Sequence, residues 1–309
     1  MIKNFNFLVK VFKETFTKWS NSSASNSSAS LAYYAIFSIP GLLIIITWIA
    51  GYFFGSEAIN GEISNQIIGL VGRDAAESVE GMVASSLVDK ENVIMKIIGV
   101  CSLVFGATTL FFQLQRSLND LWEVEAAPKK AWIKLVLDRA NSLGMIVIIG
   151  FLLMVTMVLS SAVSLLNNFI TTYFGIETYI LIEVINFTVG FLIVMLLFAL
   201  MFKILPDVEI KWKPVWAGAF LTAILFTLGK FLLSLYFSSF KPTSSFGAAG
   251  TVILLMLWVN YSCMLIFFGV EFTKVYAYRK GYKIVPSPHA KWNSNKLYSD
   301  EQIHKGQQQ

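Results

Sequence analysis

Lys230 is the residue of this sequence that most clearly requires a chemical explanation. It lies in FTLGKFLLSLYF (226–237), where the other side chains are apolar, small or hydroxyl-bearing. If this segment is a helix crossing a membrane, the ammonium group needs a carboxylate partner or a path to water. Helix rise places Glu183, in the preceding apolar segment, at the same depth, roughly 8 Å from one membrane boundary. Two interpretations follow: a Glu183–Lys230 ion pair facing the interior of a helix bundle, or a Lys230 side chain that extends to the outer interface.

A second group of polar residues lies near the middle of two other apolar segments. By helix rise, Asn260-Tyr261-Ser262 lies about 15 Å into its segment, and Pro40 lies about 14 Å into another. Interrupted helices and polar groups at the membrane centre are where transporters build substrate sites. The same residue types also form hydrogen bonds between helices. The candidate substrate-cavity residues are Tyr34, Ser38, Pro40, Lys230, Tyr261 and Ser262.

Charged residues also lie at the predicted inner ends of three apolar segments, namely Arg116, Lys203 and Glu271. Glu271 and one of these cations, Arg116 in particular, could form a charged clamp at an inner gate. The alternative is that each is a solvated end-of-helix residue.

The sequence contains no recognisable catalytic constellation. Phosphodiester cleavage needs positioned acid–base groups or a metal cluster. The two histidines, His289 and His304, both lie in the polar C-terminal region. Cys101 and Cys263 lie at different depths of different segments, which disfavours a disulfide or a metal site formed by the pair. We predict no catalytic residue, no metal and no cofactor.

The composition indicates which solvent surrounds these residues. The chain is 56% hydrophobic and 14% charged, against about 25% charged residues in soluble domains. A stretch of about 20 apolar residues spans the hydrocarbon of a bilayer, and six such stretches are present. They are 31–54, 93–112, 141–165, 178–202, 215–238 and 250–273. We therefore predict an all-α, polytopic membrane protein with six transmembrane helices, the first of them broken at Pro40-Gly41.

The distribution of basic residues predicts the orientation of these spans. Nineteen of the 24 Lys and Arg residues lie in four segments on one side of a six-span arrangement: the N-terminal segment, 113–139, 203–214, and the tail from Lys274. Cytoplasmic segments carry such an excess, so both termini are predicted to be cytoplasmic. Topology thus accounts for the net charge of +5, and no nucleic-acid partner is predicted.

The spans divide the chain into three regions. Residues 1–30 comprise an amphipathic interfacial helix predicted over 2–19, which either contacts anionic lipid head groups or only anchors the first span, and a serine-rich stretch over 20–30. This stretch is either a flexible linker or a segment whose small residues let helices approach closely or line a wet vestibule. Residues 31–280 form the membrane domain, with an acidic, amphipathic outer segment over 55–92. Residues 281–309 form a polar cytoplasmic tail that we predict to be disordered.

Three stretches in this order resemble the YihY/BrkB family of bacterial inner-membrane proteins: LAYYAIFSIPGLL, LQRSLNDLW and SFGAAGTVILLMLWVNYSCMLIFFGVEF. The resemblance implies six spans in the bacterial cytoplasmic membrane. Members carry labels such as ribonuclease BN or virulence factor, and the family pattern itself implies no activity. The residues that match it are Leu31, Tyr33, Tyr34, Ser38, Pro40, Leu114, Trp122, Gly247, Gly250, Trp258, Tyr261, Ser262, Gly269 and Glu271.

Two functions are consistent with these patterns. The first is a transporter or lipid translocase, with a cavity between spans one, five and six that handles an anionic or amphiphilic substrate. The second is a non-catalytic scaffold of the cell envelope, whose acidic outer segment binds a partner protein. Membrane lipids, with anionic head groups among them, are the expected partners in either case, and the sequence indicates no oligomeric state.

Overall fold

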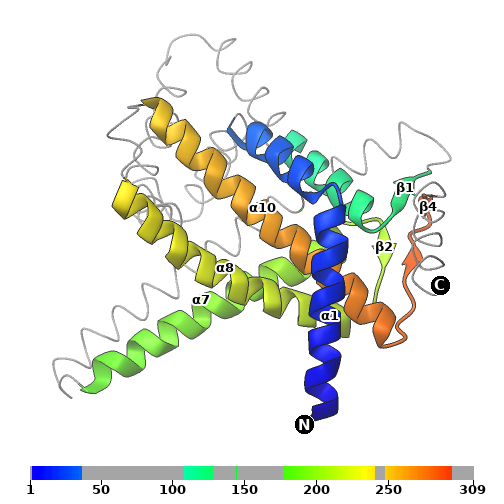
Figure 1. The fold of residues 1–309 in the computed structure, drawn as a ribbon, viewed down its shortest axis with the longest axis horizontal. Coiled ribbons are helices and arrows are strands. Elements are labelled where there is room, and N and C mark those ends of the chain that lie inside the picture. The colour runs from blue at the N-terminus through cyan, green and yellow to red at the C-terminus, as the bar shows by residue number, and fades with distance from the viewer. Residues whose placement is uncertain (1, 37–107, 128–143, 145–176, 241–247, 294–309) are drawn as a thin grey trace.

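The computed structural model describes residues 2–36, 108–127, 144, 177–240 and 248–293 (Figure 1). This part of the chain is mostly helical. It contains four fully bounded helices and two that run over 24–36 and 108–121. The bounded helices are α1 (Ile2–Asn21), α7 (Glu177–Ile204), α8 (Trp212–Phe240) and α10 (Ala248–Arg279).

Three helices are long and apolar enough to cross a membrane. The candidate spans are Phe187–Ile204 in α7, Trp212–Leu233 in α8 and Leu255–Arg279 in α10. They coincide with the predicted spans four, five and six. The break at Pro40-Gly41, the outer segment 55–92 and most of the first three spans lie outside the described residues.

Helices α8 and α10 pack against each other through small residues. Thr273 lies over Gly218, and Thr222 lies over Gly269, so that a Cβ atom added at these glycines would lie 1.7 Å or 1.8 Å from a threonine Oγ1. Each threonine hydroxyl donates within its own helix, Thr222 to Gly218 O (2.8 Å) and Thr273 to Gly269 O (2.7 Å). These pairings require the two helices to run antiparallel. Small side chains at such positions allow helix backbones to approach closely in a membrane.

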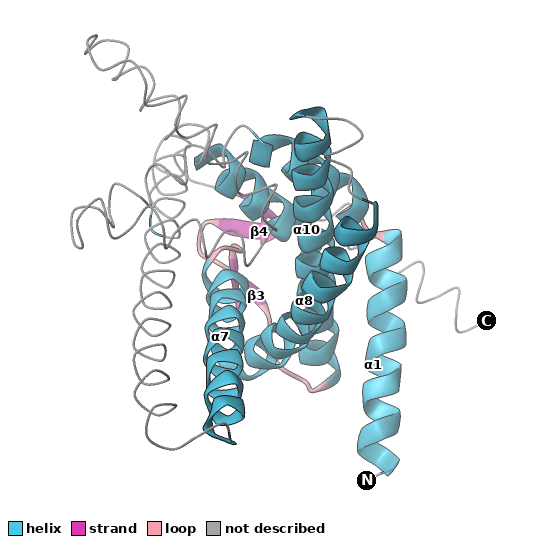
Figure 2. Cartoon of the chain, turned by 90° about the vertical axis from the view of Figure 1, so that its left-hand side faces the viewer, coloured by secondary structure: helices cyan, strands magenta, loops and turns pink. Residues whose placement is uncertain are grey.

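Helix α1 packs antiparallel along the C-terminal half of α10. The ring of Phe7 lies 6.1 Å from that of Tyr276, and the ring of Phe12 lies 5.4 Å from that of Phe272. Val11 is fully buried in this contact. Figure 2 shows α1 on the opposite side of α8 and α10 from α7. The helix predicted over residues 2–19 is thus confirmed as a helix.

The serine-rich stretch is mostly helical. After a short turn that follows α1, the chain forms the helix over 24–36. Ala24, Ser28 and Leu31 are buried along it, and the Ser28 hydroxyl donates to Ala24 O at 2.8 Å. The buried side chains of Ala24 and Ser28 fit the helix-packing interpretation of this stretch, whereas Ser25, Ala29 and Ser30 are exposed.

Four short strands join segments that are far apart in the sequence. β1 (Val124–Ala126) pairs antiparallel with β4 (Ala290–Trp292), and β2 (Val208–Glu209) pairs antiparallel with β3 (Val285–Pro286). The segment after α10 therefore holds both the segment that follows the 108–121 helix and the one that follows α7.

This arrangement differs from the disordered tail predicted from residue 281. Residues 285–286 and 290–292 are ordered as strands because their backbone groups find partners in two loops. Residues 294–309 lie outside the described part of the chain.

Helix α10 ends in a left-handed turn that directs the chain toward β3. Gly281 has a φ of 70°. Its N–H donates to Tyr278 O (3.0 Å), and the Tyr282 N–H donates to Ala277 O (2.9 Å). This pair of bonds is a Schellman motif, in which glycine takes the positive φ without steric cost.

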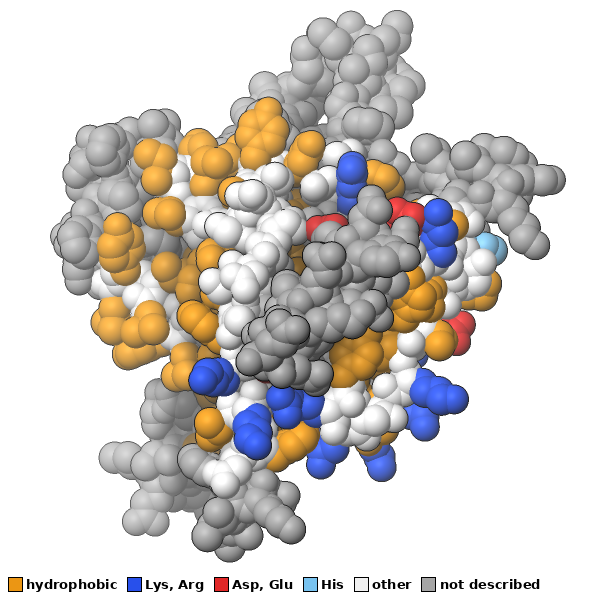
Figure 3. All heavy atoms as spheres, turned by 45° about the vertical axis from the view of Figure 1, so that its right-hand side comes forward, with side chains coloured by type: hydrophobic (Ala, Val, Ile, Leu, Met, Phe, Trp, Pro, Cys, Tyr) orange, Lys and Arg blue, Asp and Glu red, His pale blue; other side chains and the backbone are white. Residues whose placement is uncertain are grey.

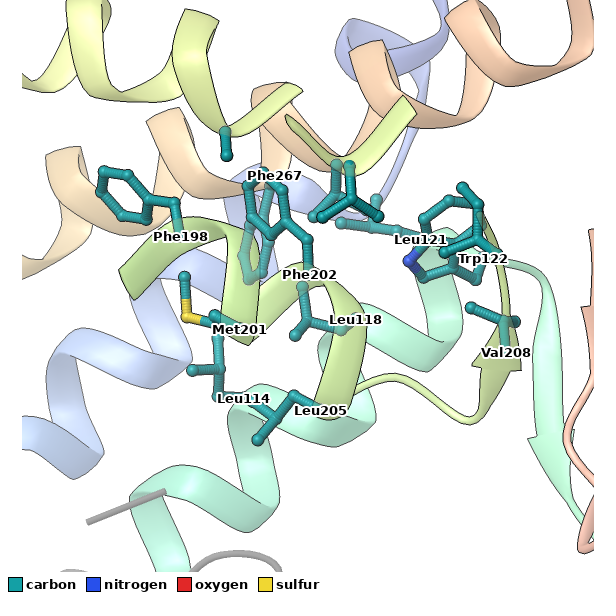
Figure 4. Close-up of a cluster of buried hydrophobic side chains, with 14 of the residues drawn as sticks. Leu114, Leu118, Leu121, Trp122, Phe198, Met201, Phe202, Leu205, Val208 and Phe267 are labelled. Atoms are coloured by element: carbon teal, nitrogen blue, oxygen red, sulfur yellow. The ribbon is translucent and has the colours of Figure 1, made fainter. Parts of the chain in front are cut away.

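The main hydrophobic core lies where the C-terminal half of α7 meets α10 and the 108–121 helix (Figure 4). Phe202 comes from α7, Leu205 directly follows that helix, Leu118 comes from the 108–121 helix and Phe267 from α10. Trp122 closes the cluster at the end of the 108–121 helix. All five side chains are at most 2% exposed, so the core fixes the three helices at the level where the strands begin.

Candidate functional site

A polar cavity of about 490 Å³ lies beside this core. Its wall combines the 108–121 helix, strand β1, the α7–β2 connection and the 24–36 helix. The lining residues are Ser27, Phe112, Gln113, Gln115, Arg116, Ser117, Asn119, Asp120, Val124, Glu125, Ala126, Asp207 and Asn293. The cavity lies at the ends of the helices where the sequence predicts the cytoplasmic side, and it is large enough for a small ligand or a lipid head group.

Neutral donors hold the two aspartates of the cavity. Asn119 forms a reciprocal pair with Asp207: its Nδ2 donates to Asp207 Oδ2 (2.9 Å), and its Oδ1 accepts from the Asp207 N–H (2.7 Å). Ser23 donates to Asp120 Oδ2 at 2.6 Å. These bonds fix the carboxylates in the wall and link the 108–121 helix to α7 and to the residues after α1.

Arg116 is the cation of this wall. Its side chain is exposed, lines the cavity and forms no ion pair within the described part of the chain. The third carboxylate, Glu125, is paired with Lys291 at 3.0 Å across the β1–β4 ladder. A planar guanidinium with unused donors is suited to bidentate binding of a phosphate or carboxylate.

A buried charged cluster lies next to the cavity. Lys274 and Glu271 of α10 are each 3% exposed, with Lys274 Nζ 3.8 Å from Glu271 Oε1. Lys274 also donates to Leu121 O (2.8 Å) and to the Glu123 carboxylate. Glu123 has a φ of 60°, a backbone conformation that costs a non-glycine residue on the order of 1 kcal/mol. We infer that Lys274 holds Glu123 in this turn, at the point where β1 enters the cavity wall.

The polar residues of the central part of α10 face different surroundings. Tyr261 lies across Gly229 of α8, where an added Cβ atom would lie 1.9 Å from the Tyr261 hydroxyl oxygen. Ser262 is 7% exposed. Its hydroxyl and the Asn260 Oδ1 have no hydrogen-bond partner among the described residues. Tyr261 thus packs two helices together, whereas Asn260 and Ser262 carry unused polar atoms at the predicted membrane centre.

The family described as virulence factor BrkB matches residues 15–293. The chain belongs to the BrkB family. The match covers nearly all of the described helices and strands, including the cavity wall and the charged cluster.

Curated relatives of this BrkB-family chain are similar over most of their length. A UPF0761 membrane protein of Pseudoalteromonas atlantica is 25% identical over 81% of this chain and 80% of its own. The UPF0761 membrane protein MS0032 of Mannheimia succiniciproducens is 22% identical over 86% of this chain and 88% of its own. The protein YfkH of Bacillus subtilis, whose name describes it as ribonuclease-like, is 23% identical over 87% of this chain and 95% of its own. No solved structure matches the chain.

The structure brings together some of the predicted site residues of the BrkB-family chain. Tyr261 covers Gly229, the residue before Lys230 in α8, so Tyr261 and Lys230 lie at a similar level of the helix pair. Tyr34 is half-buried in the 24–36 helix and contacts the ring of Tyr33, 5.7 Å away. Ser38 and Pro40 lie outside the described residues, so the predicted cavity between spans one, five and six stays a prediction.

Glu271 and Lys203, two candidates for the predicted inner clamp, each contact another group. Glu271 pairs with Lys274, and Lys203 donates to Ile210 O at 2.6 Å. Lys230 is exposed and forms no ion pair among the described residues. The Glu183 side chain lies outside them, although Figure 1 shows α7 and α8 diverging from their crossing toward Glu177 and Phe240. The Glu183–Lys230 pair stays a prediction.

The sequence analysis missed Lys274 and the cavity. Lys274 follows Glu271 by three residues, a spacing that places both on one helix face, and this was an available signal. The cavity had a weaker one: the family stretch LQRSLNDLW contains five of the lining residues, Gln115, Arg116, Ser117, Asn119 and Asp120.

Proposed function

We propose that this protein is a transporter or lipid translocase of the bacterial cytoplasmic membrane, with six transmembrane helices and both termini in the cytoplasm. The three candidate spans and the membrane-protein relatives support the location. The excess of basic residues in the predicted inner segments supports the orientation. In this orientation α1 lies at the cytoplasmic surface, and the cavity opens on the same side.

The cavity of about 490 Å³ is the observation that carries this proposal. A scaffold whose polar residues only connect its helices would need no polar cavity at the ends of its spans. Arg116 supplies an unused cation for a phosphate group, while the carboxylates and amides of the wall suit hydroxyl or amine groups of the same ligand. An amphiphile with a phosphate-bearing head group matches this set of donors and acceptors.

We further propose that the protein is not an enzyme. Among the described residues, no group of three or more His, Cys, Asp or Glu side chains could hold a metal ion. The ribonuclease-like name belongs to the Bacillus subtilis relative, and the cavity offers this chain no histidine as a general base. Recognition and movement of a head group need only the binding groups that are present.

The test is lipid exchange in proteoliposomes that contain a fluorescent phosphatidylglycerol or phosphatidylcholine, with dithionite used to bleach the outer leaflet. We expect the purified protein to accelerate exchange of fluorescent lipid between leaflets. Arg116→Gln should slow it about tenfold or more, because a hydrogen bond to a charged group contributes about 1.5–3 kcal/mol. Lys283→Gln is the matched control: it removes an exposed cation that does not line the cavity.

Two results would count against this function. One is exchange no faster than in protein-free liposomes, together with no uptake of small phosphate-bearing solutes, which would favour a scaffold. The other is equal slowing by the two substitutions, which would remove the cavity from the mechanism.

A further inference from the structure

Helix α1 has three faces rather than two. Its first face packs on the bundle and contains Val11 and Thr15, both fully buried. The second is polar and exposed, and contains Lys10, Lys13 and Thr17. A helix that served only to pack against α10 would need no third face.

The third face of α1 is an exposed apolar strip between the other two. It consists of Leu8, Val9, Phe12 and Phe16, which are 40–60% exposed. At 100° per residue these positions fall within one-third of the helix circumference. Soluble proteins rarely leave such a continuous apolar strip in water, and its presence indicates a binding surface.

The neighbours of α1 indicate the depth at which this strip lies. Ala217 and Leu221, in the first turns of α8, pack on the same hydrophobic cluster as α1. One turn nearer the start of α8, Trp212 and Trp216 are exposed and stacked, with ring centroids 6.1 Å apart. Tryptophan is enriched at the level of the lipid head groups, so α1 lies next to a predicted membrane–water boundary.

The charge of this region is positive. Lys10 and Lys13 lie on the polar face of α1, and Lys211 and Lys213 flank Trp212 at the start of α8; all four are exposed. Figure 3 shows Lys and Arg side chains gathered along the lower part of the molecule, below a surface rich in hydrophobic side chains. Apolar residues beside a row of lysines match the boundary between acyl chains and anionic head groups.

We propose that the apolar strip of α1 enters the lipid of the cytoplasmic leaflet and that Lys10 and Lys13 bind anionic head groups. Lys211 and Lys213 extend the same surface onto α8. The choice of the cytoplasmic leaflet rests on the orientation proposed above. A second copy of the chain would be a poor occupant, because two such faces would bring their lysines together.

Contacts within the protein keep α1 in place for this role. Arg279, at the end of α10, forms an ion pair with Glu14 of α1, with Nη2 2.5 Å and Nε 2.6 Å from Glu14 Oε2. Lys280 Nζ lies 4.7 Å from the centre of the Phe7 ring. Helix α1 is therefore held against the end of α10 by contacts within the protein itself.

The experiment uses the full chain in nanodiscs, with Cys101 and Cys263 replaced by alanine. A nitroxide label is placed at Phe16→Cys, on the apolar strip, or at Thr17→Cys, on the polar face. We expect the label at position 16 to be reached by oxygen and shielded from a water-soluble nickel chelate, and the label at position 17 to show the reverse. Adding phosphatidylglycerol to phosphatidylcholine should deepen the label at 16, and Lys10→Gln with Lys13→Gln should weaken that dependence.

Three outcomes would overturn the proposal. Equal accessibility at positions 16 and 17 would show that the strip is not in lipid. A label at 16 that is shielded from both reagents would mean that protein covers the strip. A label depth that does not change with phosphatidylglycerol would show that anionic head groups do not bind this surface. Both faces of a nanodisc are open to the reagents, so these results do not depend on transport activity or on orientation.

Discussion

The α8–α10 contact and the contacts around the 108–121 helix, the end of α10 and the strands are held together in opposite ways. Between α8 and α10, two glycines and two threonines bring the backbones together, and the threonine hydroxyls donate within their own helices. Around the 108–121 helix and the strands, the contacts are polar: a lysine with two carboxylates, an asparagine–aspartate pair and two short strand ladders. The glycine–threonine contact depends on shape and the polar contacts depend on partners, so substitutions should affect them by different mechanisms.

The difference follows from the solvent of each region. Lipid gives no hydrophobic drive for helices to associate, so close packing and internal hydrogen bonds must do it. Near the head groups, exposed polar groups can bind water instead of each other. A charge that is buried away from this water is stable only when it has partners within the protein. The BrkB-family chain uses both rules along a single helix, α10.

The largest effect is expected among the polar contacts. Lys274→Met leaves the Glu271 and Glu123 carboxylates without their ammonium partner. We expect a loss of about 3–5 kcal/mol in the free energy of unfolding, because one charge of a buried pair is then uncompensated. Unfolding in mixed micelles by added sodium dodecyl sulfate, followed by tryptophan fluorescence, measures it.

The control for this prediction neutralises the carboxylates as well. Lys274→Met combined with Glu271→Gln and Glu123→Gln should regain part of the loss, and Lys283→Met, at an exposed lysine, should lose little. A Lys274→Met variant as stable as the parent would mean that the cluster is open to water.

The next largest effect is expected at the glycine–threonine contact between α8 and α10. Gly218→Ala places a methyl group against Thr273 Oγ1 and close to Gly269 O, 3.0 Å away. Overpacking of this kind costs about 1–3 kcal/mol, measured by the same unfolding titration. Thr273→Ala should recover part of it when combined with Gly218→Ala, and the double-mutant cycle isolates the contact. Gly190→Ala in α7 is the control, since nothing lies within 4 Å of its added Cβ atom. An equally large loss of stability in this control would show that overpacking against Thr273 is not the cause.

A smaller effect is expected at the asparagine–aspartate pair of the cavity wall. Asn119→Ala removes one donor to the Asp207 carboxylate and the acceptor of its N–H. Leaving such groups unsatisfied costs about 1–3 kcal/mol, with the lower part of that range expected at this half-buried site. Because the Ser287 N–H donates to Asp207 O (3.0 Å), limited proteolysis should cut the segment around Ser287 faster. Asn6→Ala, at an exposed site, is the control and should leave cleavage unchanged. If Asn119→Ala also left it unchanged, the asparagine–aspartate pair would not stabilise the strand segment around Ser287.

The smallest effect is expected at the Arg279–Glu14 ion pair. Both side chains are partly exposed, and such pairs contribute about 0.2–1 kcal/mol. Arg279→Gln should therefore lower stability slightly, and added salt should reduce the difference. A loss as large as that of Lys274→Met would mean that the difference in burial between the two ion pairs does not determine their contributions to stability.

The helices could be predicted from the sequence because their signals are local. The spans predicted over 178–202, 215–238 and 250–273 correspond to α7, α8 and α10, since apolar length is counted along the chain. The apolar and basic residues of α1 recur at helical spacing in the same way. Pro214 in the first turn of α8 and Gly281 after α10 also match the known preferences of helix ends.

The candidate site could not be predicted because its residues meet across long sequence separations. Asn119 and Asp207 are 88 residues apart, and Lys274 and Glu123 are 151 residues apart. Strands of two or three residues are too short to show an alternating pattern, so the tail resembled a disordered segment. The Glu183–Lys230 pair, which helix rise suggests, stays a prediction, because the Glu183 side chain lies outside the described residues.

The glycine–threonine contact also limits which helices can slide. Each threonine lies over a glycine of the facing helix, so a shear of α8 along α10 would drive side chains into backbone. Where α7 crosses α8, phenylalanine rings meet instead, with the Phe191 and Phe220 centroids 5.9 Å apart, and ring rotation tolerates small displacements. Any movement between helices that the proposed transport requires would thus carry α8 and α10 as one rigid body.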